Sequence, residues 1–444
     1  MRRRLATLAV AATVAAGCSG PLGEPVSEPG SADAVVPPSV AWELVPGDGP
    51  DGALNDGPGG AYYPQLAVFR GRVYNTWYEL ENGVTRIRVA VLEETDAGSL
   101  WRPVDGGTNG LNRDPSRDAL WSRLVVHGDT LVAYWHERDG SDRRTIRVAA
   151  YGGDDLAPSW TYLDGDESAG LAAPGSLGSD YASLASYDGS LYAAWRSSNG
   201  SAYQIRVAVL LGDVSDPEWR LVDGGSHGIN RDIAADAYYP KLHVYAGRLY
   251  AAWYERNGTA RQLRVAVFNG DDVNPAWSLV DRGGARGLNY DTGAGARGPQ
   301  LLSHGGAMYA VWYEEDATSG GTVRVARYNG DDATPEWGLV DGGGPDGLDR
   351  GTGTRAWWAR AVSHGSYLVV AWSENDAGPY RIRASAYDPG AGTWYRLDPP
   401  SGLNAVATHA AEYPHLVSDG ERLFVSWSER YDRVFRVFVR EGAM

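Results

Sequence analysis

The feature that most constrains this chain is a repeat. Tryptophan recurs in two series, each with seven members spaced by 55 to 60 residues. The first series is Trp42, Trp101, Trp160, Trp219, Trp277, Trp337 and Trp394. The second series is Trp77, Trp135, Trp195, Trp253, Trp312, Trp372 and Trp427. Seven copies of one unit predict a repeat architecture in which neighbouring units complete each other's core.

Each unit contains four strand-like runs. Between residues 240 and 281 these are "PKLHVYA", "RLYAAWYE", "QLRVAVF" and "AWSLVD", separated by short turns such as Ala246-Gly247 and Asn257-Gly258. No segment of useful length shows a helical period, so we expect an all-β chain. Four strands in each of seven units predict a seven-bladed β-propeller with four antiparallel strands per blade.

The two ends of the repeat region predict a closed ring rather than an open solenoid. The last unit stops after "VFRVFV" and has no tryptophan strand of its own. The run "AWELVP", which begins at Ala41, is a tryptophan strand with no unit before it. If this N-terminal strand completes the last blade, all seven blades have four strands, and the chain ends must meet.

The N-terminus has the pattern of a secretory signal. Arg2, Arg3 and Arg4 precede an apolar run, and the small residues up to Gly17 lead to Cys18, the only cysteine. This arrangement resembles the lipobox of bacterial lipoproteins, which implies that Cys18 is lipidated. An ordinary secreted protein with a stray cysteine is the alternative.

These features divide the chain into three expected segments. They are a signal peptide (1–17), a lipidated cysteine with a Pro/Gly/Ser-rich disordered tether (18–38), and the propeller (39–444). The expected location is extracytoplasmic, at the outer membrane or the cell surface, with the lipid anchor as the only membrane contact.

One turn of the repeat has a known counterpart. The run "NGDDxxPxW", as from Asn329 to Trp337, resembles the Asp-box turn of sialidases and related propellers, although the spacing differs. The repeat as a whole resembles those of uncharacterised bacterial surface propellers. Both resemblances imply a fold and no particular activity.

The charge of the chain restricts its partners. The formal net charge is −16 at pH 7, which argues against nucleic acid or an anionic membrane surface as the direct ligand. The candidate partners are therefore a glycan or another envelope protein. We expect a monomer, and the sequence calls for no cofactor and no metal.

Several polar residues recur in nearly every unit. An arginine marks every third strand: Arg88, Arg147, Arg206, Arg264, Arg324, Arg383 and Arg436. A glutamate follows the second tryptophan in six units, with Ser197 in the third: Glu79, Glu137, Glu255, Glu314, Glu374 and Glu429. A residue present in every blade suggests a structural role, in which arginine contacts the Trp and Glu across its own hairpin. Binding of acidic sugars by the arginines, or of calcium by the recurring "GLNxD" loop, are the alternatives.

One ring of positions keeps its place but varies in residue. Six units carry an aromatic residue at the entry to the first strand, and Gly298 interrupts the series: Tyr63, Trp121, Tyr181, Tyr239, Trp358 and Tyr413. Two residues further on stand polar side chains: Gln65, Arg123, Ser183, Lys241, Gln300, Arg360 and His415. Aromatic faces beside planar polar groups suit sugar rings or peptides, so this ring is the candidate ligand site. Packing between blades is the alternative.

The sequence favours a binding function over an enzymatic one. It contains no Gly-x-Ser-x-Gly elbow, no zinc-binding helix motif and no phosphate-binding loop, so we name no catalytic residue and expect no enzyme. The predicted function is a lipid-anchored module that binds a glycan or an envelope protein. A polysaccharide-active hydrolase or lyase with its site at the channel mouth is the first alternative, and an envelope-assembly scaffold is the second.

The lipid anchor can be tested directly. Cys18→Ala should move the protein from the membrane fraction to the soluble fraction, because an acyl chain contributes roughly 0.8 kcal/mol per buried methylene to membrane binding. Fractionation followed by immunoblotting measures this. An unchanged membrane fraction would show that Cys18 is not the anchor.

Overall fold

The structure is a computed structural model. It describes residues 37–444 apart from 97, 166–169, 173–174, 213–215, 226, 285, 317–319, 352–353 and 376–377. The chain separates into two compact units, Met1–Pro37 and Pro38–Met444. The predicted signal peptide, Cys18 and most of the predicted tether lie outside the described residues. In the part of the chain that is described, no helix has the length and hydrophobicity needed to cross a membrane.

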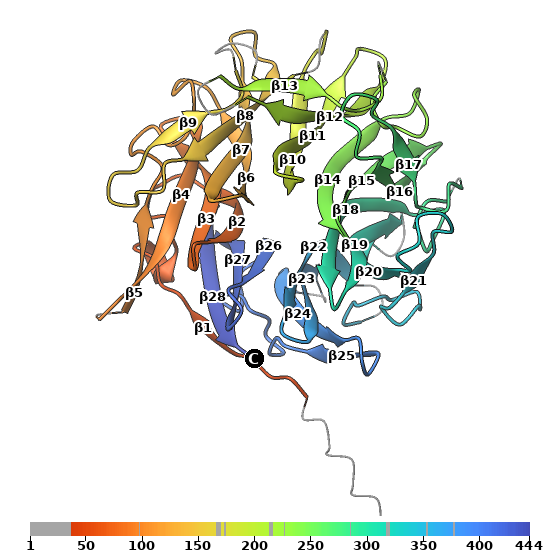
Figure 1. Cartoon of the computed structure of the whole chain (residues 1–444). Coiled ribbons are helices and arrows are strands. Elements are labelled where there is room, and N and C mark those ends of the chain that lie inside the picture. Colours follow the sequence, from red (N-terminus) through yellow and green to blue (C-terminus); the bar gives the residue numbers. More distant parts are fainter. Residues whose placement is uncertain are drawn as a thin grey trace, which may run out of the picture. The chain divides into compact units, whose positions relative to one another are not determined.

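The unit from Pro38 onward is a ring of seven antiparallel sheets, each with four strands (Figure 1). Blade 1 consists of β2 (Ala61–Phe69), β3 (Arg72–Glu81), β4 (Val84–Thr95) and β5 (Gly98–Pro103). Blade 2 consists of β6 (Ala119–His127), β7 (Thr130–Arg138), β8 (Arg144–Tyr151) and β9 (Trp160–Tyr162). Blade 3 consists of β10 (Ser179–Tyr187), β11 (Ser190–Ser198), β12 (Tyr203–Leu211) and β13 (Glu218–Leu221). Blade 4 consists of β14 (Ala237–Tyr245), β15 (Arg248–Asn257), β16 (Ala260–Phe268) and β17 (Trp277–Leu279). Blade 5 consists of β18 (Gly295–His304), β19 (Ala307–Asp316), β20 (Gly320–Tyr328) and β21 (Trp337–Leu339). Blade 6 consists of β22 (Arg355–His364), β23 (Tyr367–Asn375), β24 (Arg381–Asp388) and β25 (Thr393–Arg396). The predicted all-β, seven-bladed fold is confirmed.

Blade 7 combines the two ends of the described chain. Its strands are β26 (Ala411–Ser418), β27 (Arg422–Tyr431), β28 (Val434–Ala443) and the N-terminal β1 (Ala41–Leu44), in the order β1-β28-β27-β26. β1 pairs antiparallel with β28, with Ala41 opposite Ala443 and Leu44 opposite Arg440. The ring is therefore closed by the N-terminal strand, as the orphan tryptophan strand predicts. A single 3₁₀ turn, η1 (Pro50–Gly52), follows β1.

The core lies between the blades. Each hydrophobic cluster joins one face of a blade to the facing side of the next; one, for example, contains Val89 of blade 1 and Trp135 of blade 2. The second-strand tryptophans of blades 2 to 7 are fully buried. Because every sheet buries both faces in this way, its strands are apolar on both sides, and the first strand of each blade lines the central axis (Figure 1).

Two kinds of hydrogen bond tie neighbouring blades together, the first at six blades and the second at three. The outer-strand tryptophan of one blade donates its indole N–H to a main-chain carbonyl that follows the outer strand of the preceding blade: Trp160 to Val104, Trp219 to Leu163, Trp277 to Val222, Trp337 to Val280, Trp394 to Val340 and Trp42 to Leu397. The Asp-box-like turn supplies the second contact. Its second aspartate accepts a hydrogen bond from a tyrosine of the preceding blade, as from Tyr250 to Asp332 at 3.0 Å.

Candidate functional site

One face of the ring carries the longest loops. These loops join the fourth strand of one blade to the first strand of the next, and they lie beside the hairpins that join second and third strands. We call this the loop face. Propellers and other repeat folds place their binding residues on such loops, because the strands beneath hold them rigidly.

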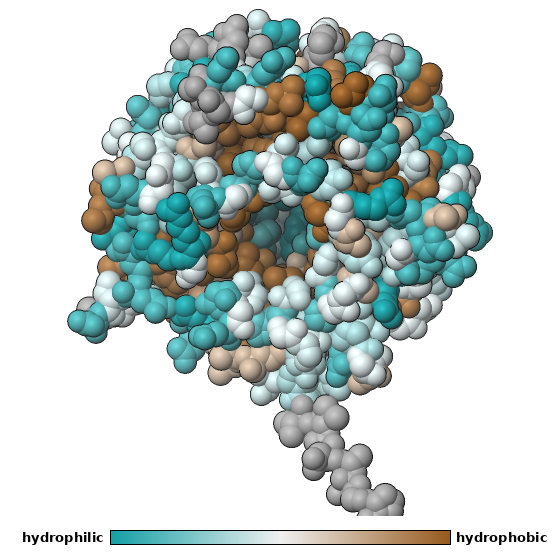
Figure 2. Space-filling view, viewed as in Figure 1, coloured by the Kyte–Doolittle hydropathy of each residue, from teal (hydrophilic) through white to brown (hydrophobic). Residues whose placement is uncertain are grey.

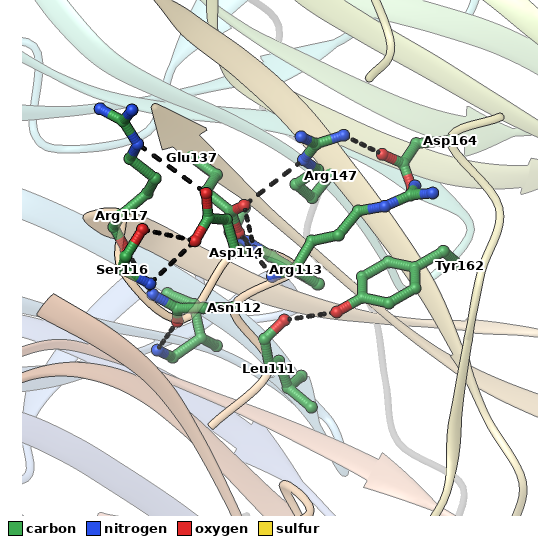
Figure 3. Close-up of polar contacts among 12 residues, drawn as sticks. Leu111, Asn112, Arg113, Asp114, Ser116, Arg117, Glu137, Arg147, Tyr162 and Asp164 are labelled. Atoms are coloured by element: carbon green, nitrogen blue, oxygen red, sulfur yellow. Dashed lines mark hydrogen bonds and ion pairs between the residues drawn. The ribbon is translucent and has the colours of Figure 1, made fainter. Parts of the chain in front are cut away.

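A buried glutamate fixes five of these loops, and blade 2 shows how (Figure 3). The Glu137 carboxylate accepts the Trp135 indole N–H at 3.1 Å and the main-chain N–H groups of Arg113 and Asp114 at 2.9 and 3.0 Å. Asn112 accepts the main-chain N–H of Ile87 at 3.0 Å. We call the tryptophan, the glutamate and the two loop amides the carboxylate clamp.

The clamp repeats around the ring. Blades 4, 5 and 7 have the same set of bonds, made by Glu255, Glu314 and Glu429, and Glu374 of blade 6 accepts the indole and one loop amide. In blade 3 Ser197 replaces the glutamate, and the Trp195 indole N–H has no partner among the described residues. The recurring glutamates therefore hold loops in place.

The recurring arginines also have a structural partner, but mainly a different one from the glutamate that the sequence suggests. Arg147 and Arg264 each pair with the aspartate that ends the fourth strand of their own blade, Asp164 at 2.9 Å and Asp281 at 3.1 Å. The Glu137 carboxylate is farther from Arg147, at 3.7 Å. The register between third and fourth strands, which the repeat does not reveal, sets this choice.

One cavity on the loop face breaks the repeat. It lies over blade 1, has a volume of about 660 Å³, and is lined by the ends of β3 and β5 and by the loop between β1 and β2. Two tryptophans, Trp77 and Trp101, line it together with the carboxylates of Glu79, Glu81 and Asp105. We call this cavity the blade 1 pocket.

Glu79 has lost the loop half of its clamp. It accepts the Trp77 indole N–H at 3.1 Å, and among the described residues no loop amide donates to it. The loop here reads "ALNDG" where blade 2 has "GLNRD", so Gly57 stands at the position of Asp114. Arg436 donates to the main-chain carbonyls of Asn55 and Gly57 instead. Burial raises the pKa of Glu79, and the Glu81 carboxylate adds to this effect.

Trp101 is the second exception in the same pocket. It is the outer-strand tryptophan of blade 1, and its buried indole N–H has no acceptor among the described residues. The equivalent tryptophans of the other blades donate to the preceding blade. A buried donor without a partner is costly, typically about 1–3 kcal/mol, so blade 1 lacks a stabilising bond that the other blades have.

The Glu81 carboxylate lies in the same pocket and has charged partners. Glu81 accepts a hydrogen bond from Arg88 Nε at 2.9 Å, and Arg86 lies 3.6 Å from its other oxygen. Arg88 is shared with Asp105, at 3.4 Å. The positive charges of Arg88 and Arg86 therefore face Glu81, whereas among the described residues the Trp77 indole alone donates a hydrogen bond to Glu79.

The six aromatic residues of the predicted ring meet at the axis. All of them, and Gly298, have a left-handed backbone at a bulge of the first strand, with φ between 53° and 61°. Tyr63 packs against Trp121 and Tyr413, with ring centroids 3.8 Å apart in both pairs. Tyr181 and Tyr239 stack at 3.9 Å, and Trp358 joins Tyr413 at 5.0 Å. Glycine at 298 makes room for the Tyr313 ring, since an added Cβ would lie 2.9 Å from it.

The polar positions two residues further on line a separate cavity. Gln65, Arg123, Ser183, Lys241, Gln300, Arg360 and His415 surround it, on the axis of the ring. The structure thus brings the predicted ring residues together as two layers: the aromatic cluster and, next to it along the strands, the axial cavity. That they bind a ligand stays a prediction.

Comparison with known proteins identifies a fold. No protein-family model matches the sequence, and no curated protein matches it. A solved structure of the polysaccharide lyase Uly1 is 10% identical, covers 86% of this chain and 90% of its own, and has a TM-score of 0.53. The GH93 α-L-arabinofuranosidase of Fusarium graminearum is 16% identical (77% and 96% covered, TM-score 0.45), and the Penicillium chrysogenum α-L-arabinanase is 13% identical (92% and 98% covered, TM-score 0.44). At these identities the likeness shows the fold alone.

The expectation that the chain is not an enzyme is contradicted by these comparisons. The similar structure with a TM-score above 0.5 is that of a polysaccharide lyase, an enzyme that acts on a glycan. The expectation depended on the absence of a local catalytic motif. In a propeller, residues from different strands and loops converge on one pocket, so a site leaves no fixed spacing in the sequence.

The residues of the blade 1 pocket were not singled out by the sequence as a site. Glu79 occurs in the same place as five other glutamates and looks like one of them. The available signal was the change from "GLNxD" to "ALNDG" in the loop before blade 1. That change removes the aspartate whose position supplies a clamp amide in blade 2.

Blade 5 shows how a variant loop residue alters stability with pH. Asp349 stands where five other interblade loops have asparagine, and it accepts the main-chain N–H of Val323 at 3.1 Å. Burial raises the pKa of Asp349 from 3.8 to about 8, and the Glu374 charge contributes. Between these values the folded protein keeps a proton that the unfolded chain has lost, so rising pH favours unfolding.

Asp349→Asn should remove this dependence, because asparagine makes the same bond without titrating. The difference in melting temperature between variant and parent should be small near pH 4, grow up to about pH 8 and then level off, as measured by thermal unfolding in a pH series. A difference that does not change with pH would show that Asp349 ionises normally.

Proposed function

We propose that the protein is a glycan-cleaving enzyme that acts outside the cytoplasm, with its reaction centre in the blade 1 pocket. The observation that carries the proposal is the state of Glu79: a buried carboxyl group, without the loop half of its clamp, in a cavity of about 660 Å³ on the loop face. The glycan-active propellers of similar fold are in keeping with this class of substrate.

Glu79 is suited to donate a proton. Its raised pKa lets it remain protonated closer to neutral pH than an exposed carboxyl does. A general acid in glycoside cleavage must be neutral when the substrate binds and must give its proton to the departing glycosidic oxygen. The Trp77 indole N–H then stabilises the carboxylate that remains, since it already donates to Glu79 Oε2.

Glu81 is suited to act as the base. Residues two apart on a strand point to the same side, so Glu79 and Glu81 of β3 face one pocket with their Cβ atoms about 7 Å apart. Two carboxyl groups on side chains spaced in this way can hold a water molecule between them, as in glycosidases that invert the anomeric centre, whose carboxyl groups are roughly 6.5–9.5 Å apart. Glu81 takes a proton from the water, the water oxygen bonds to the anomeric carbon, and the glycosidic bond breaks as Glu79 protonates the leaving oxygen.

The pocket walls suit a sugar ring. The Trp77 and Trp101 side chains form part of the pocket wall, and aromatic faces of this kind pack well against a sugar ring. A volume of about 660 Å³ lies within the range of roughly 300–1,000 Å³ typical of small-molecule sites. The pocket is open at the loop face, so a longer chain can extend over neighbouring blades. The aromatic cluster at the axis of the ring, which contains Tyr63, offers a second contact for such a chain.

The proposed location completes this function. A lipid at Cys18 and a tether of about twenty residues would hold the propeller at the outer membrane or the cell surface, where polysaccharides are met. An enzyme placed there acts on envelope or environmental glycans.

The reaction centre is tested by a matched pair of variants. Glu79→Gln keeps an oxygen for the Trp77 indole but has no proton to give, so cleavage should fall by about 100- to 10,000-fold with little loss of stability. Glu255→Gln changes the equivalent glutamate of blade 4, where the clamp is complete, so it should lower the melting temperature and leave cleavage near that of the parent. Activity is measured as new reducing ends released from a panel of polysaccharides.

Two results would move or remove the site. Full activity of Glu79→Gln, together with loss of activity in Asp349→Asn, would place the reaction centre in blade 5. An unsaturated product, seen by its ultraviolet absorbance, would make the reaction an elimination rather than a hydrolysis, so the water-activating role of Glu81 would be wrong.

A further inference from the structure

The cavity on the axis has the charge of an anion site. Its volume is about 190 Å³, and Figure 2 shows a hollow at the centre of the ring with hydrophilic residues inside it. Three basic side chains, Arg123, Lys241 and Arg360, line the cavity, and none of its lining residues is an aspartate or a glutamate. A cluster of like charges without a counter-charge is unfavourable inside a protein unless an anion accompanies it.

Three neutral residues that line the cavity accept hydrogen bonds from the main chain of the next blade. The three basic residues differ in the number of hydrogen bonds that they donate. Ser183, Gln300 and His415 each accept a main-chain N–H from the first strand of the next blade: from Leu242 at 3.1 Å, Ala361 at 2.9 Å and Leu66 at 3.1 Å. These three side chains therefore join blades.

The basic residues come from the blades between them, which are blades 2, 4 and 6. Arg360 donates to the carbonyls of Ala359 and Gly298, and Arg123 donates to Gln65 at 3.2 Å. Lys241 has no hydrogen bond or ion pair among the described residues. Lys241 is surrounded by protein atoms. Its side chain is partly exposed because it lines the axial cavity.

We propose that this axial cavity is a binding site for a small oxyanion, such as sulfate or phosphate, held by Lys241, Arg123 and Arg360. The size fits this class: 190 Å³ is about six water volumes and below the range of drug-sized or sugar-chain sites. Guanidinium and ammonium groups converging on one point are the usual ligands of such anions. The site goes beyond the proposed cleavage reaction and does not depend on it.

Anion binding at this site is coupled to a proton. Burial lowers the pKa of Lys241 well below its usual value, and the charges of Arg123 and Arg360 add to this. Burial also lowers the pKa of His415, with the same three basic residues contributing, and lowers that of Arg360 only to about 10, so Arg360 stays charged at neutral pH. An anion reverses the repulsion, so Lys241 takes up a proton as the anion binds.

The chain provides a single-site reporter, because Lys241 is its only lysine. Protein made with lysine labelled with carbon-13 at Cε gives one lysine signal, whose chemical shift follows the protonation of the amine. Sodium sulfate, compared with sodium chloride at equal ionic strength, should shift this signal toward the protonated form and raise its apparent pKa. The affinity for sulfate, from the same titration, should increase as the pH falls from 8 to 6.

Two variants complete the test. Lys241→Met should raise the sulfate Kd, measured by calorimetry, by at least about tenfold, the loss expected for one charge-assisted hydrogen bond. Arg256→Gln removes an exposed positive charge on the loop face and should leave the Kd unchanged. A lysine signal that does not respond to sulfate in the parent protein overturns the proposal, even if Lys241→Met fails to fold. Equal sulfate affinity in Lys241→Met and the parent overturns it as well.

Discussion

The carboxylate clamp is the interaction on which the loop face depends. In most blades one buried glutamate receives the indole of its own strand and the amides of the preceding interblade loop. A carboxylate that accepts several hydrogen bonds in a low-dielectric setting holds those donors in one geometry, because an unpaired buried charge is so costly. Where the clamp is complete, one side chain therefore holds two amides of the interblade loop in place. The blade 1 pocket exists because this bond set is incomplete there.

The blade 1 pocket and the axial cavity differ in the kind of polar group that lacks a partner. At the blade 1 pocket, the seam where the N-terminal strand meets blade 1 leaves Glu79 and Trp101 without their usual partners. At the axis, the ring positions of blades 2, 4 and 6 place three basic side chains around a small cavity. The first is roomy, aromatic and acidic, and suits a sugar. The second is small and basic, and suits an anion.

The sequence predicted the repeat, the closure and the fold, because tryptophan spacing and the orphan strand at Ala41 are visible in one dimension. It also identified Tyr63, Lys241 and their equivalents as a ring. It did not predict that Tyr63 contacts Trp121 and Tyr413, since this depends on the radius of the closed ring. Nor did it distinguish Glu79 from the other glutamates, because the difference lies in the backbone of the loop at Gly57. The partner of Arg147 depended likewise on strand register.

The central claim, that Glu79 lies at a glycan-cleaving centre, is tested most directly by a crystal structure of the Glu79→Gln variant with an oligosaccharide of the polysaccharide that the parent degrades. The account predicts a sugar ring between Trp77 and Trp101, with a glycosidic oxygen within hydrogen-bonding distance of the side chain at position 79. An oligosaccharide bound only elsewhere, with the blade 1 pocket empty, would contradict it.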